Sequence, residues 1–182
     1  MAVQHATGTT VWTIDPTHTE VGFAVKHMMI TTVRGRFTGV SGRIELDEEN
    51  PGASTVEVSI EASSITTGTP DRDRHLRSGD FLDVESHPEL SYRSRSVEST
   101  GEGAYRVTGD LTIRGTTREV VLAVSEEGRA QDPWGGTRVS FSATTKIDRR
   151  DFGLTWNAAM ETGGVLVGNE VKIALEVQAV LS

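Results

Sequence analysis

Acid–base chemistry in this sequence centres on two of its histidines. His27 has the same strand parity as Val21, Phe23 and Val25, so it is expected on the inner face of a strand. There it either meets the polar head of a ligand or is a core histidine satisfied by a neighbouring carbonyl or hydroxyl group. Because imidazole titrates near neutral pH, His27 could also act as an acid or a base toward such a ligand.

The second histidine, His75, precedes a carboxylate, Asp80, by five positions. Both are expected in or just after a short helix. They polarise a ligand head group, close the mouth of a tunnel, or lock the helix to the barrel, and the structural role has at least equal support. His75 is the other candidate for an acid or base.

A third group of charged residues lies near position 150. Asp148, Arg149 and Asp151 form either a functional charge network or a solvated or capping cluster around a turn. We favour the solvated or capping cluster, because charged residues at turns usually serve local hydrogen bonding.

Metal and nucleophile chemistry have weaker support. His18, His75 and His87 lack the HxH or HExxH spacing of metal sites. The sequence has no GxSxG nucleophile elbow and contains 0 cysteines. We therefore predict no catalytic residue, no metal ligand and no cofactor.

Long alternating segments must position these residues. In the clearest one, near the C-terminus, a single parity is almost entirely apolar: Val165, Val167, Val171, Ile173, Leu175, Val177 and Ala179. Alternate side chains of a strand point to opposite faces, so this pattern predicts an antiparallel strand with one dry and one wet face.

Similar alternation recurs along the chain and indicates about eight strands, several of them long. Long strands favour an up-and-down barrel over a sandwich. Between Phe37 and Val40 the apolar parity changes next to Gly39, which predicts a bulge or sharp bend. A helix is predicted over residues 70–78, with Thr69 as the N-cap and Pro70 at N1. It is too charged for a core element and is expected to plug or flank the barrel.

Composition limits the possible partners. The 182 residues carry a formal net charge of -8, which argues against nucleic acid as a partner. No transmembrane segment or secretory signal is evident, so we predict a cytoplasmic protein. We expect a disordered lead over residues 1–10 and a single domain over residues 11–182.

Several motifs, in order along the chain, resemble those of the YceI-like family. They are WTIDPTHT (12–19), VGFAVKH (21–27), RGRF (34–37), RDRHLRSGDFLD (72–83), HP (87–88), GDLTIRG (109–115) and IDRRDFGL (147–154). The resemblance covers residues 11–180. It implies an all-β, extended eight-stranded antiparallel barrel, lipocalin-like, with a long apolar tunnel. It also implies binding of polyisoprenoids or related long amphiphiles, such as isoprenoid quinones and fatty-chain lipids. Many relatives carry a secretory signal and are periplasmic, so the expected cytoplasmic location departs from those relatives.

Parity and resemblance together lead to a predicted ligand-binding set. It consists of Phe23, Val25, His27, Phe37, Val40, Ile44, Val58, Ile60, His75, Leu76, Phe81, Leu111, Ile113, Phe141, Val171 and Ile173. The favoured function is carriage, storage or sequestration of a long-chain apolar small molecule, without enzymatic activity. The alternatives are an enzyme using His27 or His75 and a packed structural barrel without a ligand. A homodimer is a further expectation.

Overall fold

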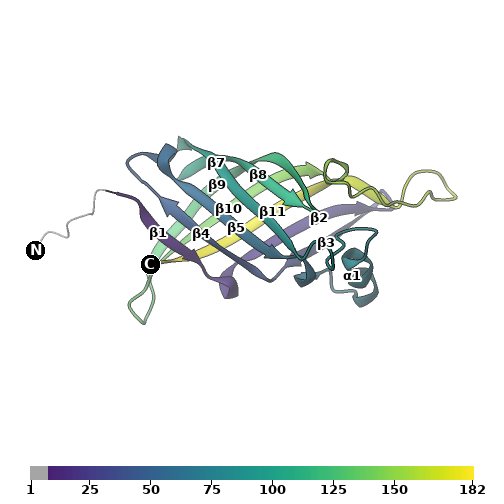
Figure 1. Cartoon of the computed structure of the whole chain (residues 1–182), viewed down its shortest axis with the longest axis horizontal. Coiled ribbons are helices and arrows are strands. Elements are labelled where there is room, and N and C mark those ends of the chain that lie inside the picture. Colours follow the sequence, from purple (N-terminus) through teal and green to yellow (C-terminus); the bar gives the residue numbers. More distant parts are fainter. Residues whose placement is uncertain (1–7) are drawn as a thin grey trace, which may run out of the picture.

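The fold is an antiparallel sheet that closes on itself (Figure 1). The computed structural model describes residues 8–182, so most of the predicted lead lies outside the described residues, and Thr10 already belongs to the first strand. The strands are β1 (Thr10–Ile14), β2 (Glu20–His27), β3 (Thr31–Phe37), β4 (Val40–Leu46), β5 (Thr55–Glu61), β6 (Ile65–Thr66), β7 (Glu89–Gly101), β8 (Ala104–Ile113), β9 (Thr116–Gln131), β10 (Thr137–Asp148) and β11 (Val167–Leu181). The helical elements are α1 (Pro70–Arg77) and the 3-10 turns η1 (Pro16–His18), η2 (Pro51–Ala53), η3 (Ala62–Ser64) and η4 (Arg149–Phe152).

Three of the eight barrel strands are interrupted, so the eight-stranded barrel contains the eleven strand segments β1 to β11. β1 continues into β2, β3 into β4, and β5 into β6. β11 closes the barrel by pairing with both halves of the first strand, as in Ile14↔Ala179 of β1 and Phe23↔Ile173 of β2. Each strand pairs with its neighbours along the chain, so the predicted up-and-down antiparallel barrel is confirmed.

The interruptions lie side by side in the barrel wall. β3 breaks after Phe37 and β4 resumes at Val40, while the neighbouring strand breaks between β5 and β6. Both Phe37 and Val40 are buried, as the predicted change of parity requires. At the break, a Cβ atom on Gly39 would lie 2.8 Å from the Cβ of Glu61, so only glycine allows this close approach.

Helix α1 confirms the predicted short helix and lies at one end of the barrel, beside β3 (Figure 1). Thr69 occupies the N-cap position, but its hydroxyl accepts a hydrogen bond from Arg72 instead of capping the helix. Arg77 attaches the helix to the wall by donating to the carbonyl oxygens of Ser63 (3.0 Å) and Ile65 (2.9 Å). Leu76 packs against the main core. The predicted flanking role follows from these contacts.

Asp73 fastens the start of the same helix. Its buried carboxylate accepts hydrogen bonds from the backbone N–H (2.8 Å) and the hydroxyl (2.5 Å) of Thr67. Burial by itself would raise the pKa of Asp73, but these hydrogen bonds and the nearby Arg77 hold it below its usual range. No helix within residues 8–182 has the length and apolar character to span a bilayer.

Candidate functional site

A cavity of about 670 Å³ occupies the barrel interior, and its wall is almost entirely apolar. Strand parity explains this wall, because the inward residues of β11 that line it are Val167, Val171, Ile173, Leu175 and Val177. The alternate residues of the same strand, such as Lys172 and Glu176, are exposed. A cavity of this size is typical of small-molecule sites.

Almost all of the residues in the predicted ligand-binding set lie on this wall. They are Phe23, Val25, His27, Phe37, Ile44, Val58, Ile60, His75, Leu76, Phe81, Leu111, Ile113, Phe141, Val171 and Ile173. Val40 does not line the cavity and packs into the core with only 2% of its surface exposed. It lies at the break in the wall, where neighbouring side chains cover it. Parity gives the direction of a side chain but not how deeply its neighbours bury it.

An aromatic cluster marks the end of the cavity that carries α1. The ring of His75 makes edge contacts with Trp156 (centroids 4.5 Å apart) and Phe81 (5.0 Å). Its Nε2 atom lies 2.9 Å from the Asp80 carboxylate. His75 therefore lines the cavity and also holds the segment after α1 in place, so both roles expected for it are compatible with the geometry.

Further polar side chains gather at this same end, which we call the helix end. His27 lies at the last position of β2 and is half-buried, and Lys26, Asp71 and Arg72 also contribute to the wall. Asp71 and Arg72 belong to the first turn of α1. The helix end thus offers charge and hydrogen-bonding groups, in contrast with the apolar interior.

Arg149 organises the loop that follows β10. Its guanidinium is buried and donates to the carbonyl oxygens of Leu154 (2.7 Å), Trp156 (2.9 Å) and Gly168 (2.8 Å). Burial lowers the pKa of Arg149 from its ordinary value. By tying these carbonyls together, Arg149 holds Trp156 against the cavity.

The predicted charge cluster at this turn therefore separates into two parts. Asp148 caps η4 by accepting from the backbone N–H of Arg150 (2.9 Å) and pairs with its guanidinium (2.6 Å). These interactions with Arg150 lower the pKa of Asp148 to about 2. The favoured capping role holds for Asp148, whereas Arg149 is a buried residue of the cavity wall and Asp151 is exposed.

Several polar or aromatic wall residues are missing from the predicted ligand-binding set, among them Tyr92, Tyr105, Arg149 and Trp156. Tyr92 lies on the strand parity of Leu90, which is a signal that could have revealed it. Its hydroxyl donates to the carbonyl oxygens of Val107 (3.3 Å) and Val120 (3.0 Å). Burial, followed by the nearby Asp110, raises the pKa of Tyr92 well above its usual range. The phenol is therefore a neutral structural group.

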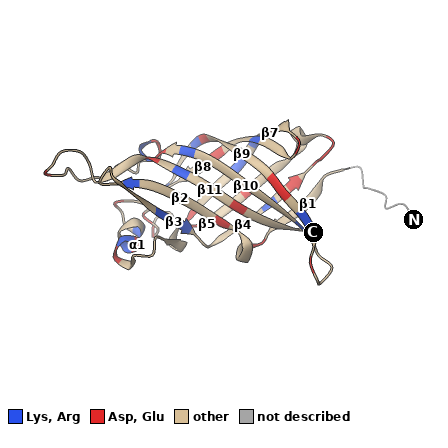
Figure 2. Cartoon of the chain, turned by 180° about the vertical axis from the view of Figure 1, so that it is seen from behind, with Lys and Arg blue, Asp and Glu red and all other residues tan. Residues whose placement is uncertain are grey.

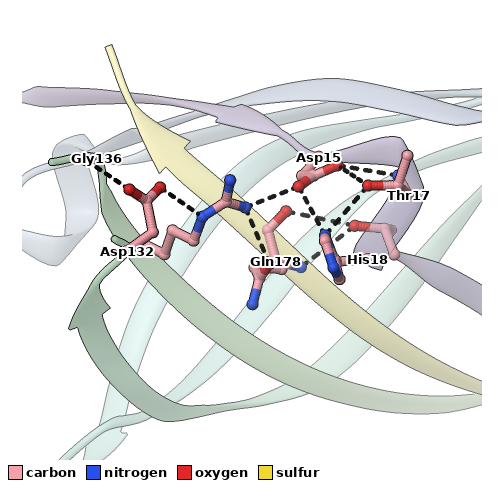
Figure 3. A network of polar contacts seen from close by, with 8 residues as sticks. Asp15, Thr17, His18, Asp132, Gly136 and Gln178 are labelled. Carbon is pink, nitrogen blue, oxygen red and sulfur yellow. Dashed lines mark hydrogen bonds and ion pairs between the residues drawn. The ribbon is translucent and has the colours of Figure 1, made fainter. Parts of the chain in front are cut away.

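A polar network lies at the opposite end, outside the cavity wall (Figure 3). The Arg138 guanidinium joins Asp15 (2.7 Å) to Asp132 (3.0 Å) and also donates to Gln178. His18 contacts the Asp15 carboxylate at 2.9 Å. The hydrogen bonds from His18, Thr17 and Arg138 hold the pKa of Asp15 far below its usual range. This network fastens the seam between β1 and β11.

No three His, Asp or Glu side chains in residues 8–182 are placed to hold a metal ion together. His18 is instead part of the polar network around Asp15. His87 lies close to Gly115, 3.0 Å from a Cβ atom built there. The three histidines considered as ligands therefore occupy separate environments.

Comparisons with known proteins agree with the motifs and the barrel. A UPF0312 protein of Pseudomonas aeruginosa is 36% identical over 163 residues, which cover 90% of this chain and 82% of the relative. The crystal structure of a Campylobacter jejuni YCEI protein aligns with a TM-score of 0.72 and 28% identity over 85% of this chain and 88% of that chain.

A more distant structure shares the fold. It is described as a polyisoprenoid binding domain from Saccharophagus degradans, and it aligns with a TM-score of 0.67 and 14% identity over 95% of this chain and 99% of that chain. The sequence profile of the YceI-like domain matches residues 12–179, which span β1 to β11. The resemblance in the motifs is thus confirmed, and the chain belongs to the YceI-like family.

Proposed function

We propose that this protein binds a long apolar amphiphile inside the barrel for carriage, storage or sequestration. A polyisoprenoid, an isoprenoid quinone or a fatty-chain lipid has the required chemistry. The observation that carries the proposal is the cavity of about 670 Å³ with its apolar wall. Burial of apolar ligand surface contributes about 0.8 kcal/mol per methylene group, so a few isoprene units would suffice for micromolar binding after the costs of association.

The distribution of polar groups supports one orientation of this ligand. His27, Arg72 and His75 lie at the helix end, whereas the wall toward the other end includes Ile44 and Phe141. Burying a polar head group without hydrogen bonds is costly, so the head belongs at the helix end and the chain points inward. The polyisoprenoid-binding description of a protein with the same fold supports the same ligand class.

The proposed function involves no chemical conversion of the ligand. The observation that favours an enzyme instead is the contact of 2.9 Å between His75 and Asp80, which resembles an acid–base pair. In this structure the same contact holds the segment after α1 beside the aromatic cluster, so a structural role accounts for it.

Native mass spectrometry of the freshly purified protein, followed by organic extraction, tests the proposal. We expect an adduct of several hundred daltons that is released chemically unchanged. A ligand that is converted on incubation would favour the enzyme. An apo mass with no uptake from a library of prenyl and fatty chains would contradict the proposal and favour a barrel that binds no ligand.

The cytoplasmic location stays a prediction, and fractionation of cells that express the natural gene would test it. Recovery in the periplasmic fraction would contradict it.

A further inference from the structure

The turn between β2 and β3 exposes three consecutive large apolar side chains. Met28, Met29 and Ile30 retain 43%, 62% and 78% of their surface exposed. Met28 and Met29 also have positive φ angles, 53° and 62°. The Ile30 N–H donates to the His27 carbonyl oxygen (3.3 Å), and β-turns with positive φ at both central positions favour Gly, Asn and Asp. This turn therefore keeps bulky apolar residues where both solvation and backbone conformation oppose them.

A second loop adds to the same apolar surface. Met28 donates its backbone N–H to the carbonyl oxygen of Leu166 (2.8 Å), which brings the loop before β11 alongside the turn. A Cβ atom on Gly164 would lie 2.7 Å from Sδ of Met29 and 3.6 Å from Cε of Met160. Val165, in the same loop, is exposed. We call this surface the apolar tip; it consists of Met28, Met29, Ile30, Met160 and Val165.

Cations without an ion-pair partner in residues 8–182 flank the apolar tip on the outer face of the barrel. Lys146 and Lys172 lie there together with Arg34, and the third lysine of the chain, Lys26, is exposed beside them at the rim of the helix end, where it also borders the cavity. Strand register places them in adjacent positions: Lys146 lies opposite Lys172, Lys172 opposite Ala24, and Ala24 opposite Arg34. Figure 2 shows basic segments on β2, β3 and the strands beside them.

These four cations have no carboxylate oxygen within 4.0 Å among the described residues, whereas the nearby Arg150 pairs with Asp148. Two carboxylates, Glu170 and Glu176, share this face of β11, and Glu176 lies farther from the apolar tip, opposite Glu20 of β2. The basic face therefore keeps an excess of positive charge in a chain whose formal net charge is -8.

We propose that the apolar tip and the basic face dock the protein on the surface of an anionic lipid bilayer. Apolar side chains enter the boundary between head groups and acyl chains, and lysines face the lipid phosphates. Lys172 lies opposite Ala24, which precedes Met28 by four residues. Lys172 is therefore about 13 Å from the turn, measured along the strand. The barrel would therefore dock at a slant, with β10, β11, β2 and β3 toward the lipid.

The position of the cavity favours lipid over a protein partner. His27 and Leu166, which adjoin the apolar tip in sequence, line the cavity wall. A docked barrel would therefore place the helix end of the cavity against the bilayer. The docking proposal goes beyond ligand binding and is tested separately from it.

A single environment-sensitive label on the apolar tip tests whether it enters lipid. Because the chain has 0 cysteines, Met29→Cys provides one attachment site for a nitrobenzoxadiazole dye. Trp134→Cys is the matched control, since Trp134 is 87% exposed in the turn between β9 and β10, near the other end of the barrel. The probes are vesicles of phosphatidylcholine alone and vesicles with roughly one-third phosphatidylglycerol.

We expect the label at position 29 to brighten and shift to the blue with the anionic vesicles, while the label at position 134 does not change. An unchanged label at position 29, or equal responses at both positions, would overturn the proposal. Light scattering without vesicles tests whether a second copy of the chain covers this surface instead. A dimer that Met29→Ser dissociates, together with no vesicle binding, would assign the surface to a second copy of the chain.

Charge removal tests the basic face. Lys146→Gln with Lys172→Gln should weaken binding to the anionic vesicles about fivefold for each lysine. The control, Arg93→Gln with Arg106→Gln, removes equal charge from β7 and β8, where both arginines are exposed. Equal losses for the two double variants would show that only net charge matters and would refute docking through this face. Circular dichroism should show that every variant keeps the wild-type fold.

Discussion

The two ends of the barrel are built in different ways. At the end where β1 begins and β11 ends, which we call the terminal end, Trp12 is buried in a compact cluster with Val139 and Phe141. At the helix end, the cavity reaches His27 and His75, which are only partly covered. Packed side chains thus close the terminal end of the barrel, whereas the helix end leaves polar residues of the cavity wall partly exposed.

The polar interactions at the two ends also differ. The terminal end uses ion pairs between Arg138 and two carboxylates, which join β1, β10 and the turn after β9. The helix end uses a buried cation, Arg149, whose partners are backbone carbonyl oxygens of the loop after η4 (Leu154 and Trp156) and of Gly168 in β11. Ion pairs between strands fix a seam, whereas a cation bound to loop carbonyls fixes the course of that loop. Five predictions test this contrast.

The largest loss of stability is expected from the removal of a buried side chain at the terminal end. Trp12→Ala removes a side chain that is 2% exposed and should lower the free energy of unfolding by about 3–5 kcal/mol. The control is Trp134→Ala, which removes an exposed tryptophan and should change the free energy of unfolding by less than about 0.5 kcal/mol. Urea denaturation measures both. Similar losses would contradict a filled terminal end.

At the helix end, Arg149→Met should lower the free energy of unfolding by about 3 kcal/mol, because buried carbonyl groups lose a charged donor. Hydrogen exchange should increase mainly in the loop over residues 154–166. Arg150→Met, at an exposed neighbour, should cost less than half as much. Exchange that increases evenly over the whole barrel would show that Arg149 supports the fold in general and not this loop.

Filling the cavity should affect long ligands most. Ile113→Trp replaces an aliphatic side chain of the wall by a larger indole ring and should weaken the binding of long prenyl chains about tenfold, with little effect on short ones. Val121→Trp, at an exposed position of β9, is the control. Isothermal titration across a chain-length series measures the effect, and equal losses at every length would argue against a tunnel.

Acid should weaken the terminal end. The pKa of Asp15 is depressed in the folded protein, so its carboxylate stabilises the fold above the unfolded-state pKa of 3.8. This contribution is lost as the pH falls through the folded-state value. Asp15→Asn should therefore cost about 1–2 kcal/mol at neutral pH and less in acid. Urea denaturation of both proteins at neutral pH and in acid measures this difference in the free energy of unfolding. A cost that does not depend on pH would exclude the ionised carboxylate as its source.

The smallest effect is expected at the proposed head-group position. His75→Leu keeps the cavity apolar but removes a polar contact, so binding of an amphiphile should weaken by about 1 kcal/mol. Binding of a hydrocarbon of equal length should stay the same. Equal weakening of both ligands would place the head group elsewhere, and an unfolding measurement would show whether the contact with Asp80 matters for stability.

The alternation of apolar and polar residues was sufficient to predict the barrel. Period-2 patterns act locally, so the inward parity of Phe23 and Ile173 could be inferred without knowing their partners. The same holds for the helix, because Pro70 and the acidic residues after it are local start signals. Thr69 shows the limit of such signals, since its hydroxyl accepts a hydrogen bond from Arg72 instead of capping the helix.

What the tertiary structure decided is which inward residues surround empty space and which residues distant in sequence meet. Val40 and Ile60 are paired in register, yet only Ile60 lines the cavity. No sequence pattern predicts the burial of Arg149, because its partners are carbonyl groups of the loop after η4 and of Gly168 in β11, which barrel closure brings next to it. The sequence by itself determined strand direction, side-chain parity and family. Cavity shape and the contrast between the two ends depend on barrel closure, because packing and desolvation depend on contacts between distant segments.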